Sequence, residues 1–301
     1  MTPLLPLAAA AGTWVLGDRT VHRIGLGTMR LPQLGPALRP DAEPRDRDGA
    51  IRLLRRAVDL GVDHLDTAAF YFSPLRSANE LISRALGPYP AGLTIATKVG
   101  PGRDPSGHWL PHATPRQLRG QVEENLRQLG RDHLDLVNLR IVGTDSIAER
   151  FGALAELRAA GLIRHLGLSN VRPHHLDEAL AVAPVVCVQN AFGLGASAEQ
   201  RAFLRTCGER GIAFVPFYAI AGEGRTTGRT GPEPAAVRAV ARPHGASPAQ
   251  VRLAWTLHQG PHVLAIPGTG DPAHLAENLA AGALRLSPAE LAALDAVPGP
   301  G

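Results

Sequence analysis

The run LDLVNLR at residues 134–140 and the segments after it show how this chain is organised. The run is short and mostly apolar, as expected of a buried β-strand. An amphipathic helical pattern follows at residues 147–160 and stops at Gly161, and a second strand-like run, HLGLS, occupies residues 165–169. Strands and helices that alternate over such short links predict parallel strands joined by crossover helices.

The same alternation extends over the whole chain. Further helical patterns at residues 48–60, 115–129 and 248–259 begin or end at typical capping residues. A β-hairpin is expected near the N-terminus, at residues 13–16 and 18–23. Eight strand-like runs follow it, at residues 24–28, 64–67, 93–98, 134–140, 165–169, 185–189, 212–217 and 263–266. Eight units in 301 residues favour an α/β fold of the closed (β/α)8 type, a TIM barrel, over an open doubly wound sheet.

The barrel is expected to span residues 12–301 as a single domain. Residues 1–11 are interpreted as a loose N-terminal extension, because they are apolar and alanine-rich but lack the basic residues of a secretion signal. The rival Rossmann fold needs a glycine fingerprint, for which the nearest candidate is Gly25 to Arg30. That segment has arginine in place of the third glycine and opens no clear helix, so we interpret it as the end of a barrel strand.

Composition limits the function classes. The net charge is +4 with no run of consecutive basic residues, which argues against nucleic acid as a partner. No apolar stretch approaches the ~20 residues that span a bilayer, so no membrane partner is expected either. Cys187 and Cys207 match no metal spacing, and they indicate either a reducing compartment or simple indifference to redox conditions. We expect a cytoplasmic protein, and the sequence gives no sign of an obligatory protein partner. His108 and His112 lack a third ligand, so no metal site is expected.

One residue stands out from this composition. Lys98 is the only lysine among 31 lysine and arginine residues, and it ends the apolar run at residues 93–98. Lysine is a compact point charge that sits beside a phenol or a carboxylate and tunes its pKa, whereas arginine is a planar, permanently charged fork. The position predicts a chemical role for Lys98, with an accidental surface lysine as the alternative.

The expected C-terminal ends of adjacent barrel strands carry further polar groups. These ends are where barrel enzymes build their active sites, and here they offer Asp66, Tyr71, Lys98 and Arg140. A phenol has a pKa of about 10 and donates its proton readily only where a cation eases its ionisation. Lys98 is expected to do this for Tyr71, with Asp66 holding the lysine, which makes a general acid. The alternative is a structural ion pair between Asp66 and Lys98, with Tyr71 packed nearby.

The motifs together resemble a known family. Asp66, Tyr71, the strand-end Lys98 and three later segments stand in the order seen in the aldo-keto reductase superfamily, and the match extends from about Gly12 to Val297. The three segments are Gly167–Asn170, Val188–Asn190, and Ile266–Thr269 continued through Glu277 and Asn278. The resemblance implies reduction of a carbonyl by NADPH. Hydride would be delivered to the carbonyl carbon, and the tyrosine would give a proton to the carbonyl oxygen.

The resemblance also implies site residues. The catalytic positions fall on Asp66, Tyr71, Lys98 and, at a fourth position, Arg140. Ser169, Asn170 and Gln189 would hold the carboxamide of the nicotinamide, and Phe217 would stack on its ring. The residues from Gly268 onward would hold the adenosine end of the cofactor with backbone amides and a helix N-terminus. The full set of expected cofactor-binding residues is Thr28, Ser169, Asn170, Gln189, Phe217, Gly268, Thr269, His274, Glu277 and Asn278.

Three departures from the family pattern bear on the substrate and the cofactor. Arg140 stands where relatives usually have histidine, and arginine cannot release a proton, although it can donate two fixed hydrogen bonds. Bulky Phe72 follows Tyr71 where glycine is common. Gly268 and His274 stand where strongly NADPH-selective members carry lysine and arginine.

Within the family, the chain resembles a bacterial branch that includes pyridoxal reductases. The resemblance lies in the segments 138–140, 109–111 and 186–190. It predicts pyridoxal or a related aromatic aldehyde as substrate, with Arg140 binding the aldehyde and the neighbouring phenolate. Trp109 or Phe72 would cover the ring face.

Two other functions stay open. The altered segments 69–73 and 191–193 should border the pocket, which would also suit a ketoreductase of a specialised metabolite. A protein that binds the cofactor as a redox sensor, with little turnover, is the third interpretation. The glycine- and arginine-rich segment 219–231 is expected to be a mobile flap over an anionic ligand.

Overall fold

The strands form one curved, parallel sheet. The computed structural model describes residues 6–220 and 232–299. The strand order is β11-β10-β9-β8-β7-β4-β3, so each strand of the sheet is hydrogen-bonded to the sheet strands that precede and follow it in the chain. The bounds are β3 (Leu26–Gly27), β4 (His64–Asp66), β7 (Thr94–Val99), β8 (Leu134–Arg140), β9 (Ile163–Ser169), β10 (Cys187–Gln189) and β11 (Ala213–Phe214).

The segment at residues 263–268 closes the sheet into a barrel. It forms single bridges to both edges, to Phe214 on one side and to Ile24 and Gly27 on the other. The amide of Leu264 donates to the carbonyl of Phe214 over 2.9 Å. The eighth strand is therefore present only as isolated bridges, in part because Pro267 has no N–H to continue a ladder. With that correction, the predicted barrel is confirmed.

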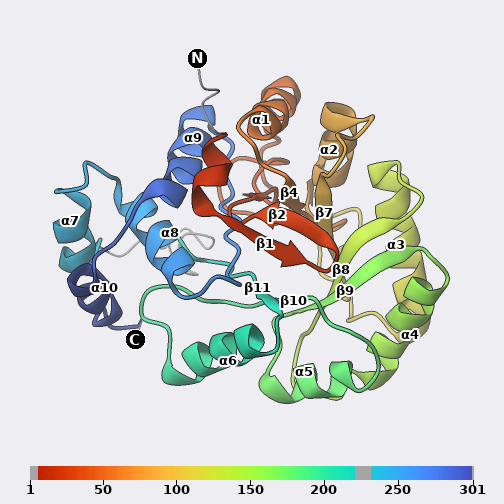
Figure 1. Cartoon of the computed structure of the whole chain (residues 1–301). Coiled ribbons are helices and arrows are strands. Elements are labelled where there is room, and N and C mark those ends of the chain that lie inside the picture. The colour runs from red at the N-terminus through yellow and green to blue at the C-terminus, as the bar shows by residue number, and fades with distance from the viewer. Residues whose placement is uncertain (1–5, 221–231, 300–301) are drawn as a thin grey trace.

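Helices surround the strands in Figure 1. Helix α3 begins at a capping box on Thr114 and ends at Gly130, whose φ of 64° is the left-handed conformation that stops a helix. Ser247 starts α8 in the same way by accepting from the amide of Gln250. The bounds are α1 (Arg47–Asp59), α2 (Ala78–Leu86), α3 (Pro115–Leu129), α4 (Ala148–Ala159), α5 (Pro173–Leu180), α6 (Ala198–Glu209), α7 (Ala235–Ala241), α8 (Pro248–His258), α9 (Pro272–Ala280), η3 (Ala281–Ala283) and α10 (Pro288–Asp295).

The predicted N-terminal hairpin is present as β1 (Thr13–Leu16) and β2 (Arg19–His22), and it lies across the near end of the barrel in Figure 1. Leu16 and Val21 of the hairpin pack against side chains inside the barrel, among them Cys187. The residues before it form a 3-10 helix, η1 (Leu7–Ala11). The expectation of a loose extension is wrong for residues 7–11, because small Ala8 and Ala11 side chains are buried in the core.

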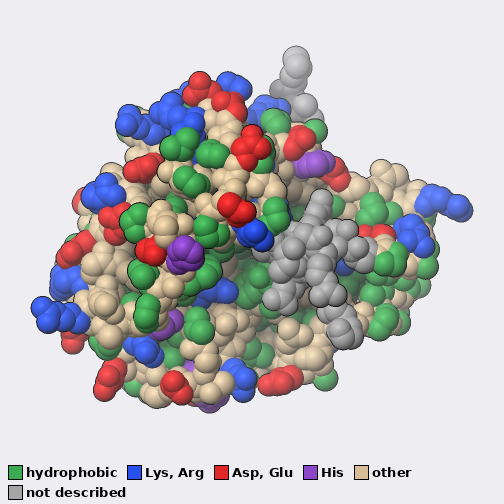
Figure 2. Space-filling model, turned by 180° about the vertical axis from the view of Figure 1, so that it is seen from behind, with side chains coloured by type: hydrophobic (Ala, Val, Ile, Leu, Met, Phe, Trp, Pro, Cys, Tyr) green, Lys and Arg blue, Asp and Glu red, His purple; other side chains and the backbone are tan. Residues whose placement is uncertain are grey.

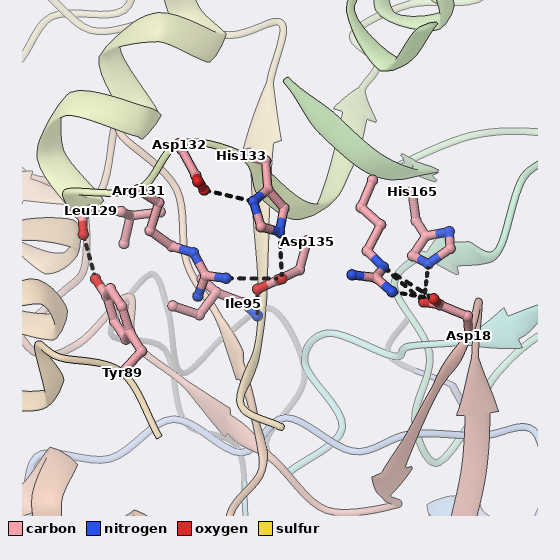
Figure 3. Close-up of polar contacts among 10 residues, drawn as sticks. Asp18, Tyr89, Ile95, Leu129, Arg131, Asp132, His133, Asp135 and His165 are labelled. Carbon is pink, nitrogen blue, oxygen red and sulfur yellow. Dashed lines mark hydrogen bonds and ion pairs between the residues drawn. The ribbon is translucent and has the colours of Figure 1, made fainter. Parts of the chain in front are cut away.

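Ion pairs hold the hairpin end of the barrel together. Asp18, in the hairpin turn, accepts from Arg164 and contacts His165, both at the start of β9, and these contacts hold the pKa of Asp18 well below its usual range. Figure 3 shows a second group, in which Asp135 contacts Arg131 over 3.1 Å. Both groups lie at the N-terminal ends of the strands, the side of a barrel that serves stability rather than catalysis.

No helix in the described part of the chain is long and apolar enough to cross a membrane. Within residues 6–220 and 232–299, no three histidine, cysteine or acidic side chains gather closely enough to hold a metal ion.

We expect both cysteines to be unreactive in the folded protein. Cys187 and Cys207 are buried and unpaired, and burial raises the pKa of both thiols, that of Cys207 to about 12. From the ordinary value of 9.0, this lowers the thiolate fraction of Cys207 by about 10³-fold. Titration with a chromogenic disulfide should detect no fast thiol in the native protein and two after addition of denaturant. Fast modification of the native protein would contradict this burial.

Candidate active site

A cavity of about 930 Å³ opens at the C-terminal ends of the barrel strands. Figure 2 views the molecule from the side opposite the hairpin, and this face is hollowed near its middle. The cavity is lined by the four expected catalytic residues, by residues after β11 and by residues around α9. Of the predicted residues, the lining includes Asp66, Tyr71, Lys98, Trp109, Arg140, Gln189, Phe217, Gly268, Thr269, His274, Glu277 and Asn278.

Lys98 is buried at the bottom of this cavity, with 3% of its surface exposed. Its Nζ lies 2.7 Å from each carboxylate oxygen of Asp66 and donates to the carbonyl of Thr67 over 3.0 Å. Burial opposes the charge, but the carboxylate of Asp66 and the phenol of Tyr71 outweigh it, so the pKa of Lys98 lies above its usual value. The lysine is therefore a fixed ammonium ion.

Tyr71 packs beside this ammonium, which lies 4.9 Å from the centre of its ring. Burial raises the pKa of Tyr71 above 10, and the nearby Asp66 raises it further, whereas Lys98 lowers it. The sequence predicts the effect of Lys98 but not the larger effect of burial. The phenol is therefore protonated at neutral pH.

Arg140 lines the cavity, half-buried. Its guanidinium donates to the hydroxyl of Ser169 over 3.3 Å and lies 5.4 Å from the centre of the Phe217 ring. No carboxylate of the described residues forms an ion pair with it. Among the described residues, the donors of Arg140 that do not contact Ser169 have no acidic partner and can bind an anionic or carbonyl oxygen.

Gln189 carries an unused acceptor. Its Nε2 donates to Asp66 over 2.9 Å, while its buried Oε1 has no hydrogen-bond partner within the described residues. A buried polar atom without a partner is costly, so a ligand N–H at this position would be favoured. The carboxamide of a nicotinamide supplies such an N–H, and Gln189 fits that expected role.

Three expected cofactor residues do not line the cavity. Thr28 is buried and its hydroxyl donates to the backbone of Asp66. Ser169 is buried and its hydroxyl accepts a hydrogen bond from Arg140. Asn170 is exposed and its side chain donates to the carbonyl of Ile141 over 2.9 Å. Their side chains serve the structure around the site in these positions.

At the end of the cavity expected to hold the adenosine, the N-terminus of α9 is capped by a side chain of the protein itself. The carboxylate of Asp271 accepts from the first amides of α9, those of Ala273 and His274, over 2.7 and 3.4 Å. In this arrangement the helix's own N-cap already occupies these amides, so a phosphate at this helix N-terminus would compete with Asp271 for them. Glu277 accepts from the hydroxyl of Ser247 and is thereby oriented.

Of the two expected substrate residues, only Trp109 lines the cavity. Trp109 lines the cavity and is 52% exposed, so its ring is available to a ligand. Phe72 is in the short hairpin of β5 (Phe72–Ser73) and β6 (Arg76–Ser77), outside the lining, and its ring lies 4.5 Å from the Arg103 guanidinium. The placement of Phe72 in the pocket is therefore wrong, because this hairpin commits the ring to Arg103.

Sequence reasoning missed part of the apolar wall. Met29, Leu38, Phe70, Tyr218 and Ile220 also line the cavity. The neighbouring Phe217-Tyr218 pair and the aromatic residue beside Tyr71 were the available signals. Of the segment expected to be a flap, residues 221–231 lie outside the described residues.

Comparison with known proteins identifies the chain. The model of the aldo/keto reductase family matches residues 23–298. A pyridoxine 4-dehydrogenase of Escherichia coli is 41% identical over 295 residues, which cover 96% of this chain and 99% of that protein. A methylglyoxal reductase of Escherichia coli is 31% identical over 290 residues, 94% of each chain.

A solved structure agrees with these matches. The aldo-keto reductase from Klebsiella pneumoniae in complex with NADPH superposes with a TM-score of 0.78 and 27% identity, over 94% of this chain and 93% of that one. Sequence, fold and the Asp66–Lys98–Tyr71 arrangement thus point to one conclusion. The chain belongs to the aldo/keto reductase family, and with it to the NADP(H)-dependent oxidoreductases.

Proposed function

We propose that this enzyme reduces an aromatic aldehyde, pyridoxal or a close relative, to the alcohol at the expense of NADPH. The observation that carries the proposal is the guanidinium of Arg140, which lines the same cavity as Tyr71 and Lys98 and forms no ion pair with a carboxylate of the described residues. The likeness to a pyridoxine 4-dehydrogenase supports the substrate class. The two free cysteines support a reducing compartment, and we place the reaction in the cytoplasm.

The cavity fits the cofactor. A bound NADPH supplies the hydride. The unpartnered Oε1 of Gln189 would accept from the carboxamide, and the ring of Phe217 offers a face for stacking. Thr269, Glu277 and Asn278 would hold the adenosine end, with His274 beside them.

Tyr71 acts as the general acid in this proposal. Its hydroxyl gives a proton to the carbonyl oxygen as the carbonyl carbon receives the hydride, so the aldehyde becomes an alcohol and the phenol a phenolate. The phenolate forms beside the Lys98 ammonium, which stabilises the new negative charge in a site of low dielectric constant. Asp66 and the carbonyl of Thr67 keep that ammonium in place. Solvent returns the proton to Tyr71 after each turnover.

Arg140 selects the substrate. Its planar fork has donors for two oxygens, and an aromatic aldehyde with an adjacent ionised hydroxyl presents two oxygens on one edge. Trp109 and Phe70, in contact edge to face at 5.7 Å between ring centres, form an aromatic wall for the ring.

The variant Arg140→His tests this selection. A hydrogen bond to a charged group contributes about 1.5–3 kcal/mol, so the ratio of kcat/KM for pyridoxal to that for benzaldehyde should fall about 10- to 100-fold. The measurement is NADPH oxidation at saturating cofactor with both aldehydes. Arg140→Lys, which keeps the charge but not the fork, should lose most of the same preference. An unchanged ratio in Arg140→His would remove the basis for pyridoxal as substrate.

A further inference from the structure

Arg103 is a buried cation without an ion-pair partner among the described residues, and the charge of neighbouring Asp104 only partly offsets the cost of its burial. Only 8% of its surface is exposed, and no carboxylate of the described residues forms an ion pair with it. Burying a guanidinium is costly, and the cost shows in a lowered pKa of Arg103. Such a residue is retained where its hydrogen bonds hold something in place.

Its hydrogen bonds surround Tyr71. The Nη1 of Arg103 donates to the carbonyl of Phe70 over 3.2 Å and to that of Phe72 over 2.9 Å, the residues directly before and after Tyr71. The central carbon of the guanidinium also lies over the Phe72 ring, 4.5 Å from its centre. One side chain thus holds the backbone on both sides of the phenol.

The same guanidinium organises the loop that carries Trp109. Arg103 pairs with Trp109 across a tight turn, in which its Nε donates to the carbonyl of Gly107 over 2.9 Å. Gly107 has a φ of +89°, and a Cβ there would lie 2.7 Å from Nη2 of Arg103, so the turn leaves space for the guanidinium and for nothing larger than glycine. Arg103 lies 5.9 Å from the centre of the Trp109 ring. The loop after β7 and the loop after β4 therefore meet on this one cation.

We propose that Arg103 is a positioning residue, which fixes the Tyr71 hydroxyl against Lys98 and ties it to the Trp109 wall of the pocket. The inference rests on the proposed role of Tyr71. Arg103 does not line the cavity, so in this proposal it contacts neither the substrate carbonyl nor the nicotinamide and acts only through the backbone of residues 70–72. Proton transfer is sensitive to such placement, since a shift of about 1 Å costs about 10²-fold in rate.

The experiment compares Arg103→Leu with a matched control, Arg131→Leu. Arg131 is also largely buried over an aromatic ring, 5.0 Å from the centre of Tyr89, but it contacts Asp135 at the hairpin end of the barrel (Figure 3). At a temperature where both variants are folded, kcat should fall about 10- to 100-fold in Arg103→Leu and less than about 2-fold in Arg131→Leu. The Kd of NADPH, measured by protein fluorescence, should stay within about 3-fold of the value for the unaltered protein in both variants. Neither substitution changes a residue that lines the cavity.

A double variant separates positioning from general damage. If Arg103 acts through Tyr71, then Arg103→Leu on top of Tyr71→Phe should change kcat by less than about 2-fold. Arg103→Lys replaces this variant if Arg103→Leu does not fold, because it keeps the stem and an ammonium within reach of the Phe70 and Phe72 carbonyls. The ammonium lacks the fork that also holds Gly107, so kcat should still fall, but by less than in Arg103→Leu.

Three results would overturn the inference: an unchanged kcat in Arg103→Leu or Arg103→Lys, an equal loss in Arg131→Leu, or a full multiplicative loss in the double variant. If Tyr71→Phe alone keeps full activity, the proposed function fails instead, which distinguishes the two failures.

Discussion

Tyr71→Phe should lower kcat/KM for aldehyde reduction by about 10²- to 10⁴-fold, the usual contribution of a general acid. The substitution removes only the hydroxyl, and the ring keeps its edge-to-face contact with Phe70, 5.2 Å between ring centres. We therefore expect the fold and NADPH binding to be nearly unchanged.

The measurement combines steady-state reduction of pyridoxal and benzaldehyde with titration of NADPH by fluorescence. Phe70→Leu, a lining residue without a proton to give, is the control for a general change of the aromatic wall. Loss of NADPH affinity along with turnover would make Tyr71 a structural residue. NADPH binding by the unaltered protein without turnover of any carbonyl would favour a redox sensor, and preference for a hydrophobic ketone would favour a ketoreductase.

Lys98→Met should abolish turnover and also lower the free energy of unfolding by about 3–5 kcal/mol, the cost of breaking a buried ion pair by removal of one partner. The substitution leaves the Asp66 carboxylate buried, with the Gln189 amide as its remaining side-chain donor among the described residues. Urea unfolding and NADPH oxidation measure the two effects separately.

The double substitution Asp66→Leu with Lys98→Met decides between the two roles that the sequence left open. Removing both charges should restore much of the stability, because two apolar groups of similar volume replace the pair. Activity should stay absent, since the cation beside the Tyr71 phenolate is gone. A stable double variant with normal turnover would make the pair structural.

Much of the fold was accessible from the sequence because local patterns agree with the global architecture. The strand at 134–140 and the helix at 115–129 have the predicted bounds, since burial on both faces and a capping box mark them clearly. The eighth strand and η1 were harder. Residues 263–268 make only isolated bridges, and an alanine-rich segment gives no period that distinguishes packed from loose chain.

The candidate site was predictable where it depends on strand ends. Barrel geometry alone brings Asp66, Lys98 and Arg140 to one cavity. The direction of the Phe72 ring and the contacts of Arg103 could not be predicted, because they depend on two irregular loops that are far apart in sequence. The same holds for Asp271, whose capping of α9 competes with the phosphate binding that a helix N-terminus suggests.

The burial of the single lysine has a consequence for a protein that handles aldehydes. Aldehydes condense with unprotonated primary amines to form imines, and lysine side chains are the usual targets on protein surfaces. Here the other 30 basic side chains of the 31 are guanidinium groups, which remain protonated and do not condense in this way. Lys98 itself is held as an ammonium by Asp66 and Thr67, without the lone pair that an imine requires. No lysine side chain therefore diverts a reactive substrate into adducts before it reaches Tyr71.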